Sequence, residues 1–362
     1  VLAELVADRL LPRRLRVLDV GAGVGGPALG LCDLLPEEAL LDYHAVEPGA
    51  GADMLEAMLA ETGRNVHATI HRTTAEGFDP STVRDGGDSD ADMTESDKGG
   101  GDGDDAEEDG PFDLILFANV LSELADPAGV LGEYADALAT DGALVALAPA
   151  DRNTAVGLRA TERAVADRGP CDVYAPTVRL WPGETPEDDC WSFDVCPDLE
   201  IPGFQRRLGE AASGDRTPSN GRGGADVETA GDSEFVNVDV QFAYSLLRRD
   251  GRRRYDFQLD PSRAARFADS ENHVTNRVDC YAAKLSHDLA DDGNPLFLLG
   301  DGSQRVSHFA VLTKETALNT DLANAGYGEV LAFENVLVLW NDDERAYNLV
   351  VDDETVVDRV PP

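Results

Sequence analysis

The chain has 362 residues, of which 42% are hydrophobic, so it can bury a sizeable core and is long enough for two domains. Its 70 acidic residues outnumber 30 lysines and arginines, which gives a net charge of −40. No apolar run approaches the roughly 18 residues of a membrane span, and the chain lacks a basic signal-peptide start. We therefore expect a cytoplasmic protein without a membrane partner. The chain opens with Val1 inside an amphipathic stretch, so we also expect that a preceding segment is missing.

The acidic charge restricts possible partners less than it first suggests. Such a surface repels nucleic acid in ordinary salt. In molar salt, however, charge repulsion is screened within about 3 Å, and acidic surfaces stay hydrated. We interpret the composition as halophilic, from a high-salt cytoplasm, which leaves RNA open as a partner. DNA is not an expected partner.

The segment Arg16–Leu31, RVLDVGAGVGGPALGL, organises the rest of the chain. An apolar strand ends at Val20, and Gly21, Gly23 and Gly25 then lead into a helical run. Glycines at this spacing allow a tight strand-to-helix turn and let a ligand lie against bare backbone. A glycine-rich turn that merely joins a strand to a helix is the alternative.

Two acidic residues make this turn more specific. Asp19 directly precedes the glycine turn, and the next strand, Tyr43–Val46, ends in Glu47, which can accept hydrogen bonds from ribose hydroxyls. The pattern resembles motif I and the acidic motif II residue of class I S-adenosylmethionine (SAM)-dependent methyltransferases. The resemblance implies SAM as cofactor, bound by Asp19, Gly21, Gly23, Gly25 and Glu47.

Helices and strands alternate along the first half of the chain, which predicts a parallel, doubly wound sheet. Residues 85–110 are almost free of apolar side chains and are predicted to be a disordered acidic insertion. Order resumes at Phe112–Phe117, five strands are complete by Asp167, and Phe235–Leu247 adds a sixth. We predict an α/β fold: a class I (Rossmann-like) methyltransferase domain over residues 1–250, with a Cys/Trp-rich segment at 169–200.

Residues 251–362 are predicted to form a small β-rich domain. Its expected strands are Arg277–Lys284, Pro295–Leu299, His308–Leu312, Glu329–Phe333, Val336–Trp340 and Tyr347–Val351. We expect a small antiparallel sheet or barrel, similar to an OB-fold, which suits RNA.

Asn119, just after the fourth strand, is the candidate catalytic residue. Base N-methylases often carry an Asn/Asp-Pro-Pro-aromatic turn there, whereas this chain has Phe117–Val120, FANV. Asn119 would orient a substrate amine, or it would instead cap the helix that follows. No cysteine stands where a carbon-5 pyrimidine methylase keeps its nucleophile, so a binding domain without catalysis stays an alternative.

Four short segments follow one another along the chain: Tyr174–Pro176, Cys190–Phe193, Phe204–Leu208 and Tyr244–Arg249. Together they resemble the methyltransferase-like family associated with the small ribosomal subunit in mitochondria and archaea. The resemblance spans Val17–Cys280. It implies a class I core, a role in small-subunit assembly and an iron–sulfur cluster held by cysteines.

The chain departs from that family at its cysteines. Where the family has an Ala-Pro-Cys-Pro-His stretch, Ala175–Arg179 contains neither cysteine nor histidine. Four thiolates suffice for a [4Fe–4S] cluster or a zinc site, although no C-x-x-C pair is present. The candidate ligands are Cys171, Cys190, Cys196 and Cys280. Relic cysteines in a segment that lost its metal are the alternative.

A dense basic cluster follows the sixth predicted strand and consists of Arg248, Arg249, Arg252, Arg253 and Arg254. Five guanidinium groups in so acidic a chain predict contact with RNA phosphates. A solvated hairpin end is the alternative.

The leading hypothesis is a SAM-binding protein that acts on the small ribosomal subunit, either by methylating its rRNA or by assisting its assembly. The alternatives are a catalytically inactive assembly or RNA-binding factor and a SAM-dependent small-molecule methyltransferase.

Overall fold

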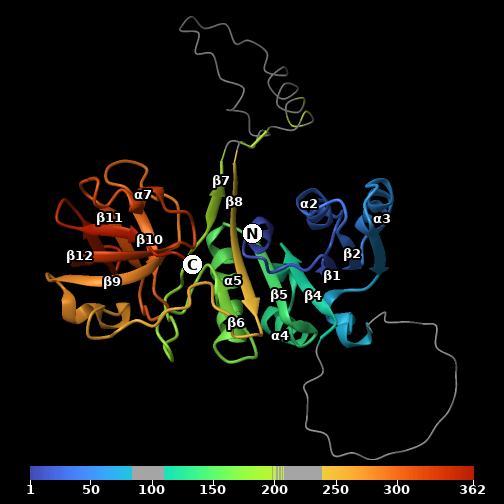
Figure 1. Cartoon of the computed structure of the whole chain (residues 1–362), viewed down its shortest axis with the longest axis horizontal. Coiled ribbons are helices and arrows are strands. Elements are labelled where there is room, and N and C mark those ends of the chain that lie inside the picture. Colours follow the sequence, from blue (N-terminus) through green and yellow to red (C-terminus); the bar gives the residue numbers. More distant parts are fainter. Residues whose placement is uncertain (84–109, 198, 201–202, 204, 206, 208–238) are drawn as a thin grey trace, which may run out of the picture.

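The computed structural model describes residues 1–83, 110–197, 199–200, 203, 205, 207 and 239–362. The predicted acidic insertion at 85–110 lies outside these residues, apart from its last residue. Two sheets organise the described chain, one on either side of residue 250, and they lie side by side in Figure 1. Among the described residues, no helix combines the length and apolarity needed to cross a bilayer.

The first sheet has eight strands in the order β3-β2-β1-β4-β5-β8-β6, with β7 paired to β8. Strands β1 to β5 run parallel, and β8 runs antiparallel to its neighbours. The bounds are β1 Arg14–Val20, β2 Leu40–Val46, β3 Val66–His71, β4 Phe112–Ala118, β5 Leu138–Pro149, β6 Asp172–Ala175, β7 Asp194–Cys196 and β8 Val240–Arg248. The predicted parallel, doubly wound sheet is confirmed.

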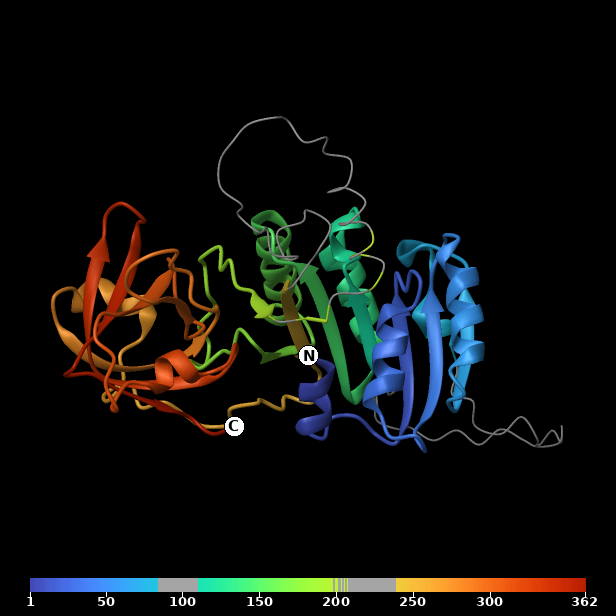
Figure 2. The same ribbon diagram turned by 90° about the horizontal axis from the view of Figure 1, so that it is seen from above.

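Helices cover both faces of this sheet, as Figure 2 shows from above. Leu5, Leu31 and Leu55 of α1 to α3 belong to the core on one face, while α4 and α5 contribute Val130 and Leu158 to the core on the other. The helices are α1 Leu2–Ala7, α2 Gly26–Leu34, α3 Gly51–Glu61, α4 Pro127–Asp136 and α5 Arg152–Ala166. Because the inner strands are buried on both faces, they contain continuous apolar runs such as LILFA in β4.

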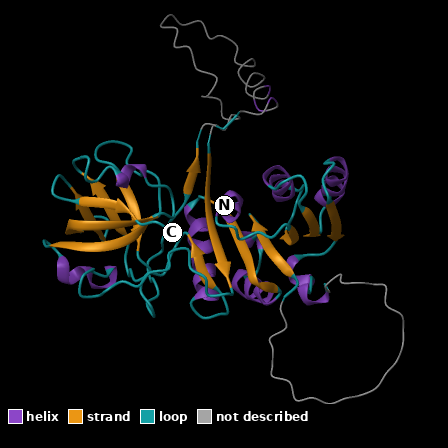
Figure 3. Cartoon of the chain, viewed as in Figure 1, coloured by secondary structure: helices purple, strands orange, loops and turns teal. Residues whose placement is uncertain are grey.

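The second sheet closes into a small barrel. Figure 3 shows its strands in orange at one end of the molecule. Its order is β13-β11-β10-β9-β12-β14, and β12 also pairs with β13, which joins five strands in a ring. Strands β11 and β13 are parallel, and a short helix, α7, lies between β11 and β12 in the chain. This is the strand order of the OB-type barrel that the sequence predicted. The elements are β9 Arg277–Lys284, β10 Leu296–Gly300, β11 His308–Leu312, α7 Asp321–Asn324, β12 Val330–Asn341, β13 Ala346–Val351 and β14 Val356–Arg359.

Some element predictions need correction. The two strands expected on either side of Asn335 are one strand, β12, whose pairing with β9 is irregular between Phe333 and Val336. Asn335 has a positive φ of 61° there, and such a bulge interrupts the alternation from which strands are predicted. Strands β6, β7 and β14 are short additions, of three or four residues, that the sequence did not indicate.

The Cys/Trp-rich segment joins the two domains. Leu180 donates its backbone N–H to the Asp301 carbonyl at 3.0 Å, and the Trp181 indole donates to Asp301 Oδ2 at 2.8 Å. The same carboxylate oxygen accepts the Phe267 N–H at 2.9 Å. Burial raises the pKa of Asp301 to about 6. The segment therefore packs against the barrel, and the buried Asp301 carboxylate is one of its contacts there.

A buried ion pair on α5 stabilises the adjoining part of the first domain. Arg159 Nη1 lies 2.6 Å from Glu162 Oε2, and both side chains are completely buried. Arg159 also donates to the Tyr244 carbonyl, and Glu162 accepts from Thr177. Arg159 keeps the pKa of Glu162 below its usual range despite burial, which alone would raise it.

We expect R159M to destabilise the protein by about 3 kcal/mol, because it leaves the Glu162 carboxylate buried without its main partner. The double variant R159M/E162L removes both charges and should recover a large part of that loss. Urea unfolding midpoints measure both effects. A single variant as stable as the wild type would show that the pair contributes nothing.

Candidate functional site

The glycine turn after β1 has the geometry that its sequence predicts. Gly21, Gly23 and Gly25 have φ values of +69°, +55° and +92°, which residues with a side chain rarely adopt. A Cβ on Gly21 would lie 2.6 Å from Val120 Cγ2, and one on Gly25 would lie 2.5 Å from Leu55 Cδ1. The turn therefore requires glycine both for its backbone conformation and for its close packing.

Glu47 is tied directly to this turn. Its Oε2 accepts the Gly23 N–H at 2.9 Å, and its Oε1 accepts the Gly49 N–H at 2.6 Å. The start of α3 also packs directly on the turn, since a Cβ on Gly51 would lie 2.7 Å from the Gly23 carbonyl oxygen, and this contact was not among those predicted. The run of small residues from Gly49 to Gly51 directly after Glu47 is the signal that could have revealed it.

Asp19 lies beneath the turn and is completely buried. Its Oδ2 accepts a hydrogen bond from the Tyr43 hydroxyl, while Oδ1 has no hydrogen-bond partner among the described residues. Burial, together with the nearby negative charge of Glu47, raises the pKa of Asp19 to about 7, although the Tyr43 bond opposes the shift. Such a carboxyl group responds readily to any positive charge brought to the turn.

Asn119 follows β4 and is exposed at the same end of the sheet. It has a positive φ of 61° and donates its backbone N–H to the Leu147 carbonyl at 3.0 Å. The following 3₁₀ helix, η3 (Leu121–Glu123), has Val120 as its N-cap and no side-chain cap bond. Capping by Asn119 is therefore wrong. Asn119 instead lines two cavities, of about 230 and 790 Å³.

These features fit a nucleoside cofactor such as SAM. The turn exposes close-packed backbone, and a carboxylate lies at the end of the adjacent strand. Beneath them, one buried carboxylate oxygen has no hydrogen-bond partner in the part of the chain that the structure describes. Both Glu47 carboxylate oxygens already accept a hydrogen bond from a backbone N–H group. Ribose hydroxyls would therefore donate to the remaining lone pairs of these two oxygens. The roles predicted for Asp19, Gly21, Gly23, Gly25 and Glu47 toward SAM stay predictions.

The four candidate cysteines do not form the predicted metal site. Among the described residues, which include all four, no group of three or more potential ligands could hold a metal ion. Cys171 packs in the first-domain core, Cys280 in the barrel core and Cys190 between the domains, while Cys196 is exposed on β7. Burial raises the pKa of Cys171 to about 11 and that of Cys190 to about 12, so both stay protonated thiols.

Two of the five clustered arginines are bound within their own domain. Arg248 is buried, pairs with Asp250 and donates to the Asp141 carbonyl at 2.8 Å. Arg249 donates to the Asp136 carbonyl at 3.1 Å, at the end of α4. Both guanidinium groups therefore hold the end of β8 against neighbouring backbone.

The other three arginines differ among themselves. Arg253 donates to the Arg179 carbonyl, Arg254 lies 3.4 Å from a Glu4 carboxylate oxygen, and Arg252 is exposed. Internal bonds thus account for four of the five. Contact between this cluster and RNA stays a prediction.

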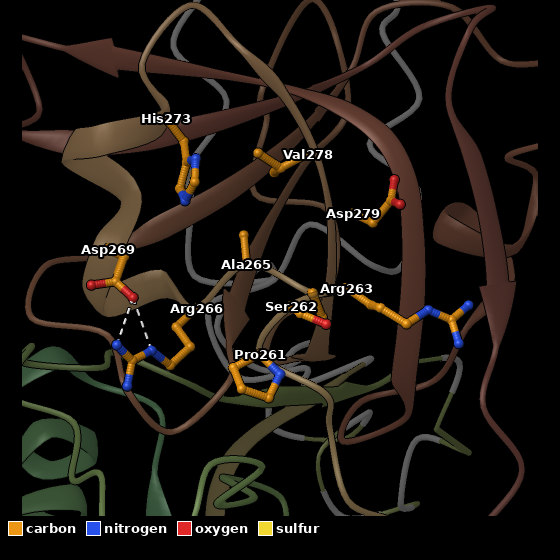
Figure 4. A pocket seen from close by; sticks show the side chains of 10 residues that line it. Pro261, Ser262, Arg263, Ala265, Arg266, Asp269, His273, Val278 and Asp279 are labelled. Atoms are coloured by element: carbon orange, nitrogen blue, oxygen red, sulfur yellow. Dashed lines mark hydrogen bonds and ion pairs between the residues drawn. The ribbon is translucent and has the colours of Figure 1, made fainter.

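Figure 4 shows a separate cavity of about 310 Å³ in the C-terminal domain, lined by residues between Pro261 and Asp279. Arg266 turns toward Asp269, and it also lies 2.9 Å from a Glu184 carboxylate oxygen. Its charge is therefore already compensated. This cavity offers no buried, unpartnered polar group that would indicate a ligand among the residues described around it.

The comparison with protein families shows the family to which this chain belongs. A family model described as a methyltransferase domain matches residues 1–193, more than half of the chain. The chain belongs to this methyltransferase family. A second model, described as the C-terminal domain of a domain of unknown function (DUF8157), matches residues 268–360, which contain the barrel. No curated protein matches the chain significantly.

Solved structures resemble parts of this chain. The YcgJ protein from Bacillus subtilis is 19% identical over 41% of this chain and 50% of its own, with a TM-score of 0.27. A SAM-dependent methyltransferase from Aquifex aeolicus is 15% identical over 41% of this chain and 65% of its own, with a TM-score of 0.28. The [4+2]-cyclase SpnF is 16% identical over 68% of this chain and 80% of its own, with a TM-score of 0.35. The chain thus matches less than two thirds of the first two proteins, and scores this low carry no information on substrate.

We expect G23L to abolish SAM binding, because its side chain would occupy the surface predicted to hold the cofactor. The Gly23 position has room, since a Cβ there would meet only the Gly21 carbonyl oxygen at 4.0 Å. Isothermal titration calorimetry with SAM measures the effect.

G63L is the matched control. Gly63 also has a positive φ, of +63°, and open space around it, but it lies at the far end of α3. Backbone strain alone would weaken both variants equally, whereas a cofactor surface at Gly23 predicts normal binding by G63L. Equal affinities of G23L and wild type would refute the assignment of the turn.

Proposed function

We propose that this protein is a SAM-dependent methyltransferase whose cofactor lies against the Gly21–Gly25 turn and Glu47. The observation that carries the proposal is the hydrogen bond from the Gly23 N–H to Glu47. This bond joins the carboxyl ends of β1 and β2, where open α/β sheets bind their ligands.

The chain's own residues would hold and orient the reactants. When bound, SAM supplies a methyl group whose carbon bonds to the acceptor atom, while the S–CH₃ electrons stay on sulfur and the acceptor proton passes to water. Transfer of this kind depends chiefly on aligning the two reactants. Asn119 follows β4 and lines the larger cavity, and there it would orient the acceptor by hydrogen bonding.

SAM affinity should rise with pH around neutrality. SAM brings a net positive charge to the turn, which favours the ionised form of Asp19, and the pKa of that group in the free protein is about 7. Protons therefore compete with SAM below pH 7, and affinity should increase by up to about tenfold between pH 6 and 8. Titration calorimetry across this range measures the slope. D19N should bind more weakly and with a flat profile, and an equally steep profile in D19N would exclude Asp19 as its source.

A second candidate is action on the small ribosomal subunit, by rRNA methylation or assembly. The OB-type strand order of the C-terminal barrel favours it, because such barrels commonly bind oligonucleotides.

One labelling experiment separates the candidates. The protein is incubated with tritium-labelled SAM and a cell extract in molar KCl, and the mixture is sedimented on a gradient. After unreacted SAM is removed by chromatography, we expect a labelled low-molecular-mass product with the wild type and none with G23L. Label in small-subunit RNA, with the protein comigrating, would establish the second candidate. Comigration without label would instead indicate a catalytically inactive assembly factor.

A further inference from the structure

A cavity of about 790 Å³ opens at the carboxyl ends of β4 and β5 and at the amino end of the antiparallel strand β8. Helices α1 and α2 border it on one side, and Figure 1 shows the amino terminus beside these strands. Its lining consists of Val1, Leu2, Gly30, Asp33, Leu34, Ala118, Asn119, Leu147, Ala148, Pro149, Val240, Gln241 and Phe242.

The cavity adjoins the glycine turn. Gly21 packs so closely on Val120 that a Cβ there would lie 2.6 Å from its side chain, and Asn119, the preceding residue, lines the cavity. The hydrogen bond from Asn119 to the Leu147 carbonyl joins the two strand ends that form the cavity wall. A molecule in the cavity therefore lies next to the surface proposed for the cofactor.

The chemistry of the lining indicates what this molecule is. Leu2, Leu34, Leu147, Val240 and Phe242 present apolar side chains. Asn119 and Gln241 contribute amides, and Asp33 is the only ionisable side chain among the described lining residues. No lysine, arginine or histidine side chain is among them to neutralise a phosphate or carboxylate.

We propose that this cavity binds the methyl acceptor, and that the acceptor is a small, mostly apolar molecule without a negative charge. Apolar groups of the acceptor contact the leucine, valine and phenylalanine side chains, and Asn119 donates to or accepts from its nucleophilic nitrogen or oxygen. The proposal rests on the proposed methyltransferase function, whose site it extends from the cofactor to the acceptor.

Two dyes that share one ring system test the charge preference. N-phenyl-1-naphthylamine is uncharged, whereas 8-anilino-1-naphthalenesulfonate adds a sulfonate to the same rings. The uncharged dye should bind the wild type with one-to-one stoichiometry, and the sulfonate should bind about tenfold more weakly. Fluorescence titration measures both. Equal or tighter binding of the sulfonate would overturn the proposed class of acceptor.

A pair of glycine substitutions locates the dye. Gly30 lines the cavity and Gly132 lies on α4 outside it, and a Cβ at either position would meet no atom within 4 Å. Both positions are helical, so phenylalanine is tolerated at each. G30F fills the cavity and should weaken binding of the uncharged dye by about tenfold or more, whereas G132F should not. Equal dye affinity of G30F and wild type would overturn the assignment of the cavity.

S-adenosylhomocysteine binding, measured on the same samples, keeps the two proposals apart. The wild type, G30F and G132F should all bind it equally, because Gly30 lies outside the glycine turn. Failure of the wild type to bind it would count against the proposed function, while the dye titrations report on the cavity independently.

Discussion

The hydrogen bond from the Gly23 N–H to Glu47 is the contact on which the candidate site depends. It forms only because the turn runs through three glycines with positive φ, and because Gly51 lets the start of α3 approach the Gly23 carbonyl. A side chain at Gly21 or Gly25 would collide with Val120 or Leu55. The turn is thus fixed by packing from β4 and α3, and the site is an outcome of how the whole sheet is assembled.

The sequence predicted those parts of the fold that a local pattern determines. The continuous apolar run of β4 and the glycine spacing after β1 each identify their element without reference to the rest of the chain. The barrel could be anticipated for the same reason, since most of its strands alternate. The bulge at Asn335 could not, because an irregular pairing depends on the partner strand β9 and leaves no local signal.

The functional residues that sequence reasoning placed least well were those whose roles depend on distant partners. Cys171 and Cys280 look like a ligand set only while their positions are unknown, and the fold places them in different cores. Arg248 and Arg249 form a dense cluster in sequence, yet their guanidinium groups bind Asp250 and the end of α4. Closeness in sequence therefore did not predict which side chains act together. The partners available to each thiol or guanidinium group depend on the residues against which the fold packs it.

The molecule is strongly acidic, whereas the larger cavity is mainly apolar, and this difference bears on how an acceptor would be recognised. A net charge of −40 lies on a molecule whose cavity beside Asn119 is lined mainly by aliphatic and aromatic side chains. Salt at molar concentration weakens long-range attraction and repulsion between exposed charges, but it leaves hydrophobic burial in place and strengthens it when the anions are excluded from protein surfaces. Apolar contact is therefore less sensitive to salt concentration than charge pairing as a means of recognition. An acceptor recognised through the cavity would thus be selected by its shape and apolar surface, and the acidic exterior would serve solubility without taking part in the choice.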